Sequence, residues 1–572
     1  MRNNVPQKVL LIISISLIYL SHPLFAEFDK PIKASKGMVV TANKLATETG
    51  LKILKDGGNA IDAAVAVGFT LAVTYPYAGN LGGGGFMVLH LSNGKNTSID
   101  FREKAPLLSN KNMYLDDEGN YIPELSQTGV TSVGVPGSVA GLIYALKKYG
   151  TMSLAKVIQP AINLAIKGWV LDDNTASSFE HFLPEFNKYN SSKKIFSKKG
   201  QPYKKGELFV QKDLGWTLEQ IKQKGRDGFY KGKVAKLLVK QISKNNGYIT
   251  LEDLARYNPI EREPIFGTYR GYKIVSMPPP SSGGIALVEL LNILENFKFK
   301  TSDWNSSSYI NKMVEAMKYV YADRTYKLGD EDFYPVPKKT LISKKYAKTI
   351  FDKLTPFATP STTIQKDILP KQKESTETTH FSVYDKYGNA VSITTTINSA
   401  FGSKIVVDGA GFLLNNEMDD FSAKPGEPNQ FGLLGSKANS IEPEKRMLSS
   451  MTPTIVLKDE KPYIVVGSPG GSTIITTVLQ VIMNVIDFNM NIKEAVSVPR
   501  FHHQWFPDKI YVEKFCINKD TEQNLTKMGY TLANRNSTFR ILGSAQAILI
   551  DNKNKTIYGA SDPRRNGLAK GF

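Results

Sequence analysis

Thr378 and Thr379 stand at the start of a predicted strand, directly after a loop rich in Lys, Glu, Ser and Thr. A threonine hydroxyl is a weak nucleophile until a base lies beside it, and a threonine at a chain N-terminus obtains that base from its own α-amino group. This group titrates near ~8, closer to neutral pH than a lysine at ~10.4. Thr378 gains such an amine only if the peptide bond after Glu377 is cut, which makes Glu377 and Thr378 candidate cleavage residues. The alternative for Thr378 is a β-branched residue in an ordinary strand.

A glycine-rich turn at residues 467–471 (GSPGG) is a candidate anion site. It lies between a predicted strand, 463–466, and a predicted helix, 472–485. Backbone N–H groups at the start of a helix lack partners within the helix, and glycines let an anion approach them closely. The turn therefore suits an oxyanion hole, in which one donor is worth ~3 kcal/mol in the transition state. A plain tight turn with a serine N-cap is the alternative.

Charged residues of opposite sign occur in two further places. Arg102 ends a predicted strand, and arginine is favoured where a carboxylate must be held by two parallel hydrogen bonds. Residues 415–420 (NNEMDD) concentrate acceptor groups after an apolar segment, which suits recognition of an ammonium group. The alternatives are a surface salt bridge of Arg102 with Glu103 or Asp100, and a calcium site whose spacing would not be that of an EF-hand.

Four motifs in this order resemble those of the γ-glutamyltranspeptidases, a family of N-terminal-nucleophile hydrolases that cut their own chain. They are residues 378–383 (TTHFSV), 413–422 (LLNNEMDDFS), 448–451 (LSSM) and 467–472 (GSPGGS). The resemblance covers nearly the whole chain after residue 30. It implies an α+β fold, the αββα four-layer sandwich. It also implies three segments, namely a signal peptide 1–26, a large subunit 27–377, and a small subunit 378–572 that begins with the catalytic Thr378.

The resemblance also assigns roles to individual residues. Thr378 would be the nucleophile, and the hydroxyl of Thr396 would hydrogen-bond it. The implied oxyanion donors are Gly470 and Gly471. The implied substrate contacts are Arg102, Ser449 and Ser450 at the α-carboxylate, and Asp420, Glu417 and Asn398 at the α-amino group. Residues 425–432 resemble the lid loop of bacterial members, in which Phe431 replaces a tyrosine.

The implied reaction removes or transfers the γ-glutamyl group of glutathione and related compounds through a γ-glutamyl-threonine ester. Water would release glutamate, whereas an amino acid or peptide acceptor would give a new γ-glutamyl product. The resemblance implies no cofactor and no metal. Two alternatives stay open. One is a related β-lactam side-chain (glutaryl) acylase, which does not need Arg102 and Asp420 together, and the other is a secreted basic binding protein whose chain stays uncut.

Hydrophobic periodicity predicts the elements that position these residues. Residues 390–396 alternate with period 2 and pair, through a turn at 387–389, with a strand that begins near Thr378. Residues 82–85 are glycines without the ending of a P-loop, so we expect close backbone packing there. A strand is expected at 86–91, and helices at 43–56, 59–73, 138–148, 153–167, 285–294 and 311–324. Residues 355–377 lack periodicity and are predicted to be a processing linker.

Composition limits the compartment and the partners. Residues 1–26 have the pattern of a secretory signal, with basic Arg2 and Lys8, a largely apolar run at 9–20 and a cleavage site after Ala26. The run is shorter than the ~20 residues that span a bilayer, and an uncleaved membrane anchor is the alternative. We therefore expect a periplasmic or secreted protein. The single cysteine, Cys516, excludes an intrachain disulfide and a cysteine-based metal cluster.

The chain is strongly basic, with 72 Lys and Arg against 53 Asp and Glu and a net charge of +19. Much of this charge lies in lysine pairs at 193–194, 198–199 and 204–205, which are predicted to be solvated loops. Binding to nucleic acid or to an anionic membrane is the alternative. No nucleic-acid fold signature accompanies the pairs, so we expect no nucleic-acid partner.

Overall fold

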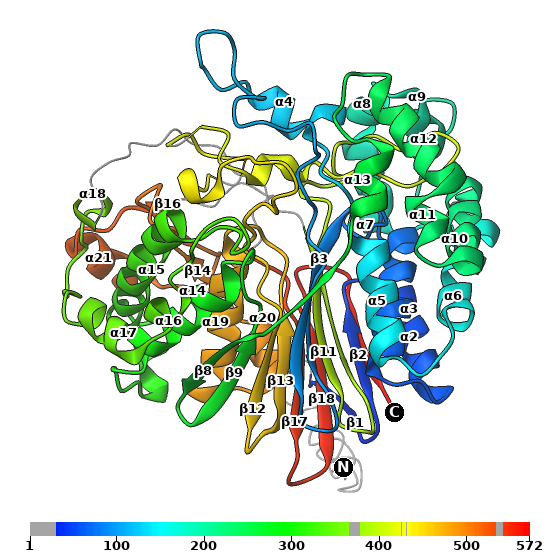
Figure 1. Ribbon diagram of the computed structural model, residues 1–572. Helices are drawn as coiled ribbons and strands as arrows, with labels where there is room; N and C mark the ends of the chain where they lie inside the picture. Colours follow the sequence, from blue (N-terminus) through cyan, green and yellow to red (C-terminus); the bar gives the residue numbers. More distant parts are fainter. Residues whose placement is uncertain (1–29, 365–377, 425, 431, 534–541) are drawn as a thin grey trace, which may run out of the picture.

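The computed structural model describes residues 30–364, 378–424, 426–430, 432–533 and 542–572. Two seven-stranded sheets lie face to face within these ranges, and helices cover the outer face of each sheet (Figure 1). The order of layers is therefore helix, sheet, sheet, helix. This arrangement confirms the predicted αββα sandwich of the α+β class.

Both large sheets are antiparallel throughout. Sheet A has the order β1 (Ile32–Ala34), β18 (Thr556–Ser561), β17 (Gln546–Asp551), β13 (Lys461–Gly467), β12 (Thr454–Lys458), β9 (Tyr272–Ser276) and β8 (Ile265–Tyr269). Sheet B has the order β19 (Leu568–Gly571), β2 (Met38–Thr41), β10 (Thr379–Tyr384), β11 (Ala390–Thr396), β3 (Gly84–His90), β4 (Asn96–Asp100) and β7 (Ile260–Arg262). Smaller sheets contain β14 (Phe501–His502), β15 (Ile510–Val512) and β16 (Leu532–Ala533), and β5 (Trp169–Val170) with β6 (Leu208–Phe209).

The alternation of side chains along each strand divides the apolar residues among three layers of core. On β2, Val39 packs with the helices outside sheet B, and Val40 packs between the two sheets. On β13, Val465 lies between the sheets, whereas Val466 faces the helices outside sheet A. Because successive residues of a strand point to opposite faces, one apolar run serves two cores. The strands at the centre of the molecule are consequently buried on both faces.

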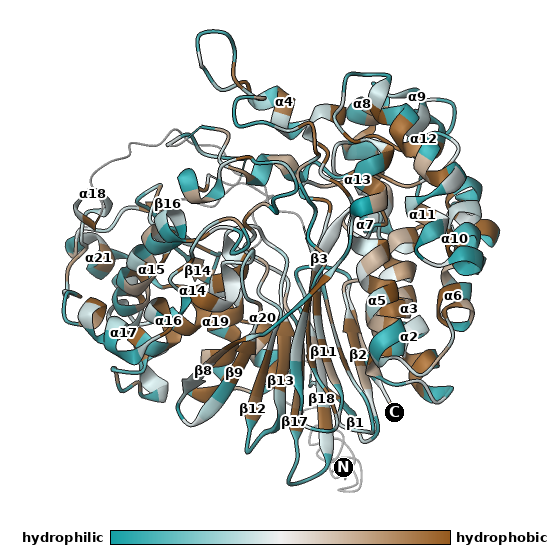
Figure 2. Ribbon diagram, viewed as in Figure 1, coloured by the Kyte–Doolittle hydropathy of each residue, from teal (hydrophilic) through white to brown (hydrophobic). Residues whose placement is uncertain are grey.

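Helices with apolar inner faces complete the outer layers (Figure 2). On sheet B, all fifteen residues of α3 (Ala60–Thr74) are buried, and Asn59 caps the helix in a capping box with Asp62. Its neighbours are α2 (Lys44–Lys55), α5 (Ser138–Tyr149) and α6 (Leu154–Lys167). The helices on and around sheet A are α14 (Gly283–Leu294), α15 (Ser307–Lys327), α19 (Thr473–Ile486) and α20 (Ile492–Ser497). The predicted helices are therefore confirmed, and α15 extends beyond its predicted ends.

The other α-helices of the described ranges vary in length from four to thirteen residues. They are α4 (Pro123–Gln127), α7 (Asp173–His181), α8 (Leu183–Phe186), α9 (Asn190–Phe196), α10 (Lys212–Lys224), α11 (Asp227–Tyr230), α12 (Gly232–Ser243), α13 (Leu251–Arg256), α16 (Lys338–Leu341), α17 (Lys344–Phe351), α18 (Ser361–Ile364) and α21 (Lys519–Lys527). Within the described ranges, no helix combines the length and apolar character that crossing a membrane requires. The predicted signal peptide lies outside the described residues.

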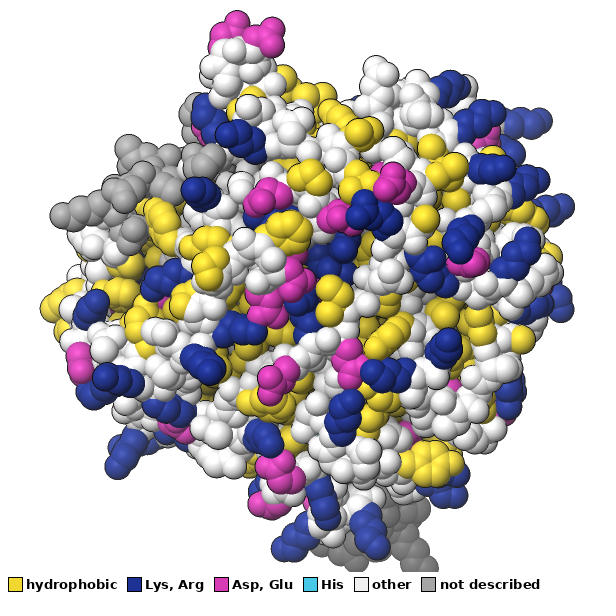
Figure 3. Space-filling view, in the orientation of Figure 1, with side chains coloured by type: hydrophobic (Ala, Val, Ile, Leu, Met, Phe, Trp, Pro, Cys, Tyr) yellow, Lys and Arg dark blue, Asp and Glu magenta, His cyan; other side chains and the backbone are white. Residues whose placement is uncertain are grey.

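Two sequence predictions need correction. The lysine pairs are exposed as expected, but Lys193 and Lys194 belong to helix α9 and not to a loop. Lysine and arginine side chains are spread over the visible face with acidic side chains among them (Figure 3). The predicted linker from residue 355 is also ordered in its first part. Ser361 begins helix α18, its N–H donates to Asp508 at 2.8 Å, and its hydroxyl donates to the carbonyl of Trp505 at 2.7 Å.

Candidate active site

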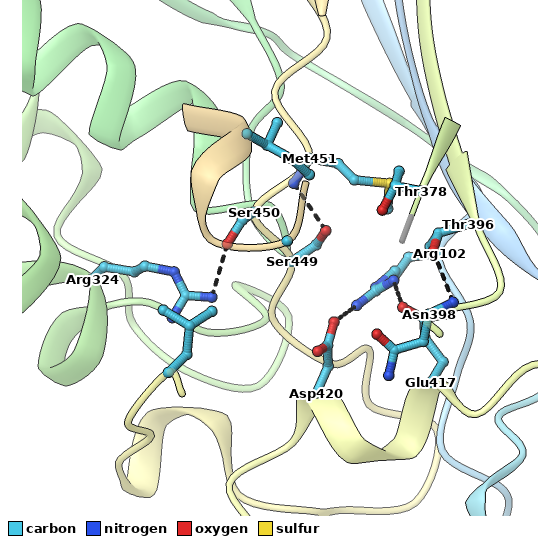
Figure 4. Close-up of a pocket in the computed structure, with 13 residues that line it drawn as sticks. Arg102, Arg324, Thr378, Thr396, Asn398, Glu417, Asp420, Ser449, Ser450 and Met451 are labelled. Carbon is cyan, nitrogen blue, oxygen red and sulfur yellow. Dashed lines mark hydrogen bonds and ion pairs between the residues drawn. The ribbon is translucent and has the colours of Figure 1, made fainter. Parts of the chain in front are cut away.

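Thr378 and Thr396 meet at the ends of the two central strands of sheet B. β10 and β11 pair with Thr379 opposite Thr395, so the residue before β10 lies next to the last residue of β11. Both threonines line a pocket with about 300 Å³ of space (Figure 4). The Thr396 hydroxyl accepts a hydrogen bond from the N–H of Asn398 at 2.8 Å. This bond fixes the side chain of Thr396 beside Thr378, the candidate nucleophile.

The glycine run before β3 packs against the strand that carries Thr396. A Cβ atom on Gly83 would lie 2.1 Å from the carbonyl oxygen of Thr396, and one on Gly85 would lie 2.4 Å from that of Thr394. Any larger residue would push β11 out of place. The prediction of close backbone packing is therefore confirmed.

Arg102 lies just beyond β4 and is fully buried. Its guanidinium pairs with Glu417 and Asp420, which belong to the short 3-10 helix η3 (Glu417–Asp420), and lies 3.5 Å from Glu103. Its Nε donates to the carbonyl of Met447 at 3.2 Å. The alternative of a surface salt bridge is wrong, because the whole cluster is inaccessible to solvent or nearly so.

Three carboxyl groups thus surround the Arg102 guanidinium, and burial favours their neutral forms. Burial raises the pKa of Glu103 to about 7 and the pKa of Glu417 well above its ordinary value, although Arg102 opposes both shifts. Burial also raises the pKa of Asp420 against the effect of Arg102. Because like charges this close disfavour full ionisation, the three carboxyl groups do not titrate independently of one another. The charge of Arg102 is therefore compensated within the protein.

Ser449 and Ser450 form the opposite side of the pocket from Asp420 (Figure 4). The backbone of Ser449 is fixed by the loop before α14, since its N–H donates to Pro280 and its carbonyl accepts from the N–H of Ser282, at 2.9 and 2.8 Å. The Ser449 hydroxyl accepts from the N–H of Met451 at 3.1 Å. The Ser450 hydroxyl accepts from Arg324 at 3.2 Å.

Arg324 is a pocket residue that sequence reasoning missed. It lies near the end of α15, inside a correctly predicted helix, but no motif marked it. The other pocket residues without a sequence prediction are Met451, Leu433 and Ile474. The only sequence signal for Arg324 was its charge. It is an arginine on a helix that must also cover an apolar core, and such a residue can be directed into a site.

The turn after β13 carries two adjacent glycines with positive φ angles, 135° at Gly470 and 55° at Gly471. Such angles are strained for any other residue. Gly471 lines the pocket directly, and Gly470 precedes it. Ser472 stands at the N-cap position of α19, as the alternative predicted, but its side chain makes no capping bond and its hydroxyl donates to Gln504 at 2.6 Å.

The loop predicted as a lid lies against the acidic side of the pocket. Asn429 donates to Asp420 at 3.2 Å, and the N–H of Gln430 donates to Asp419 at 3.0 Å. Leu433 lines the pocket. Phe431, the residue in the position of the family tyrosine, lies outside the described residues, as does the cleavage residue Glu377.

The predicted residues that line this pocket are Arg102, Thr378, Thr396, Asn398, Glu417, Asp420, Ser449, Ser450 and Gly471. They come from five segments of the chain. Within the described ranges, no group of three or more His, Cys, Asp or Glu side chains has the arrangement of a metal site. The pocket lining thus places the Thr378 side chain with an acidic wall and a hydroxyl-rich wall.

Comparison with known proteins agrees with this geometry. Residues 46–572 match the family model described as gamma-glutamyltranspeptidase. The chain is 51% identical to the glutathione hydrolase proenzyme of Escherichia coli K12, over 93% of this chain and 91% of that protein. Among solved structures, a cephalosporin acylase from Bacillus halodurans matches 97% of this chain and 98% of its own, with a TM-score of 0.85 and 28% identity. The Helicobacter pylori gamma-glutamyltranspeptidase matches 56% of this chain and 93% of its own, with a TM-score of 0.56 and 53% identity. The chain therefore belongs to the γ-glutamyltranspeptidase family.

Proposed function

We propose that this protein is a glutathione hydrolase and γ-glutamyltransferase that acts through an N-terminal Thr378. One observation carries the proposal. The pocket places the acidic groups of Glu417 and Asp420 and the hydroxyls of Ser449 and Ser450 on either side of a site that Thr378 also lines. A γ-glutamyl group carries an α-ammonium and an α-carboxylate at one end and the scissile carbonyl at the other. The pocket is complementary to all three.

In the proposed acylation step, the Thr378 hydroxyl oxygen attacks the γ-amide carbonyl carbon. The free α-amine of Thr378 takes the hydroxyl proton and then passes it to the leaving nitrogen as the carbon–nitrogen bond breaks. The products are an amine and a γ-glutamyl ester of Thr378. In the second step, water or an acceptor amine attacks the ester carbonyl carbon. The α-amine takes a proton from this attacking group and passes it to the threonine oxygen as the ester carbon–oxygen bond breaks.

The negative charge that develops on the carbonyl oxygen needs donors that are already in position. The N–H groups of Gly470 and Gly471 are the proposed donors, because the turn that contains them brings Gly471 to the pocket that Thr378 also lines. Thr396 and Asn398 are proposed to orient the nucleophile and the ammonium group, respectively. Their mutual hydrogen bond keeps both at the end of β11.

Processing of a precursor supplies the free amine. The proposed products are a large subunit, 27–377, and a small subunit, 378–572, after removal of a signal peptide, 1–26. The relative from Escherichia coli is named a proenzyme, which supports such a cut. The proposed location is the periplasm or the medium, and the proposed partners are γ-glutamyl donors and amino acid or peptide acceptors.

An acylase reaction is the second candidate, because the cephalosporin acylase from Bacillus halodurans has the same fold. A glutaryl group has the terminal carboxylate of a γ-glutamyl group but lacks the ammonium. Glu417 and Asp420, which pair with Arg102, would then meet no cationic group on the substrate. The buried acidic wall therefore favours the γ-glutamyl donor.

Three p-nitroanilides separate these candidates. We expect processed enzyme to release p-nitroaniline efficiently from the γ-glutamyl compound. The glutaryl compound lacks the ammonium, and the 4-aminobutyryl compound lacks the α-carboxylate, so each should have kcat/KM lower by about 30-fold or more, the lower end of the cost of an unpaired buried charge.

Thr378→Ala is the control for these assays and should release no p-nitroaniline from any of the three. A wild-type protein that prefers the glutaryl compound would be an acylase. One that cleaves none would exclude both candidates.

A further inference from the structure

Arg324 is a buried cation beside the pocket, with no carboxylate within ion-pair distance in the described part of the chain. Arg324 is only 5% exposed to solvent. Burial lowers the pKa of Arg324 to about 10, so the group remains charged at neutral pH. A buried charge that is not paired is costly, which makes its retention next to a ligand pocket informative.

Arg324 makes two hydrogen bonds, both to serine hydroxyls. Its Nε donates to Ser282 at 3.1 Å, and its Nη2 donates to Ser450 at 3.2 Å. The Ser282 hydroxyl in turn donates to the carbonyl of Ser449 at 2.6 Å. The guanidinium therefore holds the side chain of Ser450 directly. It holds the backbone of Ser449 indirectly, through the Ser282 hydroxyl.

These contacts determine the direction of the serine hydrogens. A guanidinium has only donors, so the Ser450 oxygen must accept from Arg324 and its hydrogen must point elsewhere. The Ser449 oxygen likewise accepts from the N–H of Met451. Both serines line the pocket, and Figure 4 shows Arg324 behind Ser450 with its guanidinium directed toward it. Both hydroxyls are thus available to donate to an oxygen atom in the pocket.

The two pocket arginines differ in how much of their charge is compensated. Arg102 is surrounded by Glu103, Glu417 and Asp420, whereas Arg324 faces neutral hydroxyls. An anion bound at Ser449 and Ser450 would therefore experience the field of Arg324 more fully than that of Arg102. Charges interact more strongly in a site shielded from water than in bulk solvent. The difference in charge compensation between the two arginines is therefore large enough to affect binding of the anion.

We infer that Arg324 is a positioning residue for the α-carboxylate of the donor, acting through Ser450. It turns the Ser450 hydroxyl into a fixed donor and supplies, at the carboxylate end of the pocket, a positive charge that no carboxylate of the described residues pairs with directly. The inference rests on the proposed γ-glutamyl function and deepens it, because it names a further group that acts at the carboxylate subsite.

Arg324→Gln tests the inference with two donors. For γ-glutamyl-p-nitroanilide, KM should rise about 10- to 100-fold with a smaller change in kcat, the range expected for hydrogen bonds to a charged group. For 4-aminobutyryl-p-nitroanilide, which lacks the α-carboxylate, kcat/KM should stay within about threefold of the wild-type value, less than the tenfold step of 1.4 kcal/mol. Arg324→Lys should restore part of the loss.

Two further variants separate positioning from folding. Arg270→Gln removes another arginine, paired with Asp487 at 3.1 Å and outside the pocket, and should leave both donors unaffected. Ser450→Ala combined with Arg324→Gln should cost less than the sum of the single changes, because both act on one hydroxyl. If Arg324→Gln is not processed, the same donor comparison is made with Arg324→Lys.

Equal losses for the two donors in the Arg324 variants, or no loss for either, would overturn the inference and leave a purely structural role. Additive losses in the double variant would overturn the route through Ser450. These outcomes differ from failure of the proposed function itself, in which the wild-type protein would not cleave the γ-glutamyl donor.

Discussion

We propose that Arg102 serves two opposite subsites. Its guanidinium holds Glu417 and Asp420 at one edge of the pocket, and the serines line another edge. When an ammonium group binds to these carboxylates, it competes with Arg102 for them and leaves the guanidinium more available to the substrate carboxylate. Recognition of a zwitterion is thereby coupled within one cluster.

Replacing Arg102 or Asp420 with Ala should raise KM for γ-glutamyl-p-nitroanilide by roughly 30-fold or more. Truncation of one partner of a buried pair costs ~2–5 kcal/mol, and 1.4 kcal/mol corresponds to a factor of ten. Steady-state kinetics of the processed variants gives the measurement. Arg256→Ala is the control, since Arg256 pairs with Glu252 on the surface and should change KM little. Values within twofold of wild type for both pocket variants would remove the assigned subsites.

At the scale of elements, the 3-10 helix η3 connects the acidic wall to the lid loop. Asp419 accepts hydrogen bonds from Ser126, on α4, at 2.8 Å and from the N–H of Gln430 at 3.0 Å. Burial raises the pKa of Asp419 to about 6, above the ordinary value of 3.8. The folded protein therefore binds this proton more tightly than the unfolded chain does.

The sign of the resulting pH dependence follows from linkage. The stability associated with neutral Asp419 is fully present below about pH 4 and is lost as pH rises through about 6. Asp419→Asn keeps a neutral group there, so its melting temperature should fall less between pH 4 and pH 7 than that of the wild type. The exposed Asp117→Asn is the matched control. Parallel melting curves for Asp419→Asn and wild type would contradict the assignment.

Sequence could predict the elements and motifs whose signals are local. The hairpin of β10 and β11 follows from period-2 alternation and a turn, and α3 follows from a long run of small apolar residues. The polar face of β11 packs against β13 of the other sheet, which no local pattern indicates. Ser392 on β11 donates to the backbone carbonyl of Val466 on β13, 74 positions away. Arg324 was missed for the same reason, since Ser450 lies 126 positions further along the chain. Contacts across such distances depend on how the layers stack.

In the molecule as a whole, each large sheet combines strands from both sides of the expected cut. In sheet A, β9 precedes the cut and pairs with β12, which follows it. In sheet B, β10 and β11 follow the cut and lie between β2 and β3, which precede it. Separating the two fragments would break backbone ladders in both sheets and expose the core between them. The fragments should therefore remain together after cleavage.

The final prediction concerns the cut itself. Mature protein should give two bands in denaturing gels, at about 39 and about 22 kDa, and a single peak in native size exclusion. The small fragment should begin Thr-Thr-His-Phe, because the Thr378 hydroxyl attacks the carbonyl of Glu377 and water opens the resulting ester.

Thr378→Ala removes the oxygen needed both for processing and for catalysis, so it should give one inactive band near about 60 kDa. Thr378→Ser keeps the hydroxyl but loses the methyl group that restricts χ1, and should be processed slowly. An uncut wild-type chain with full activity would exclude the N-terminal amine as the base. Fragments that separate without denaturant would show instead that the shared sheets do not hold the two parts together.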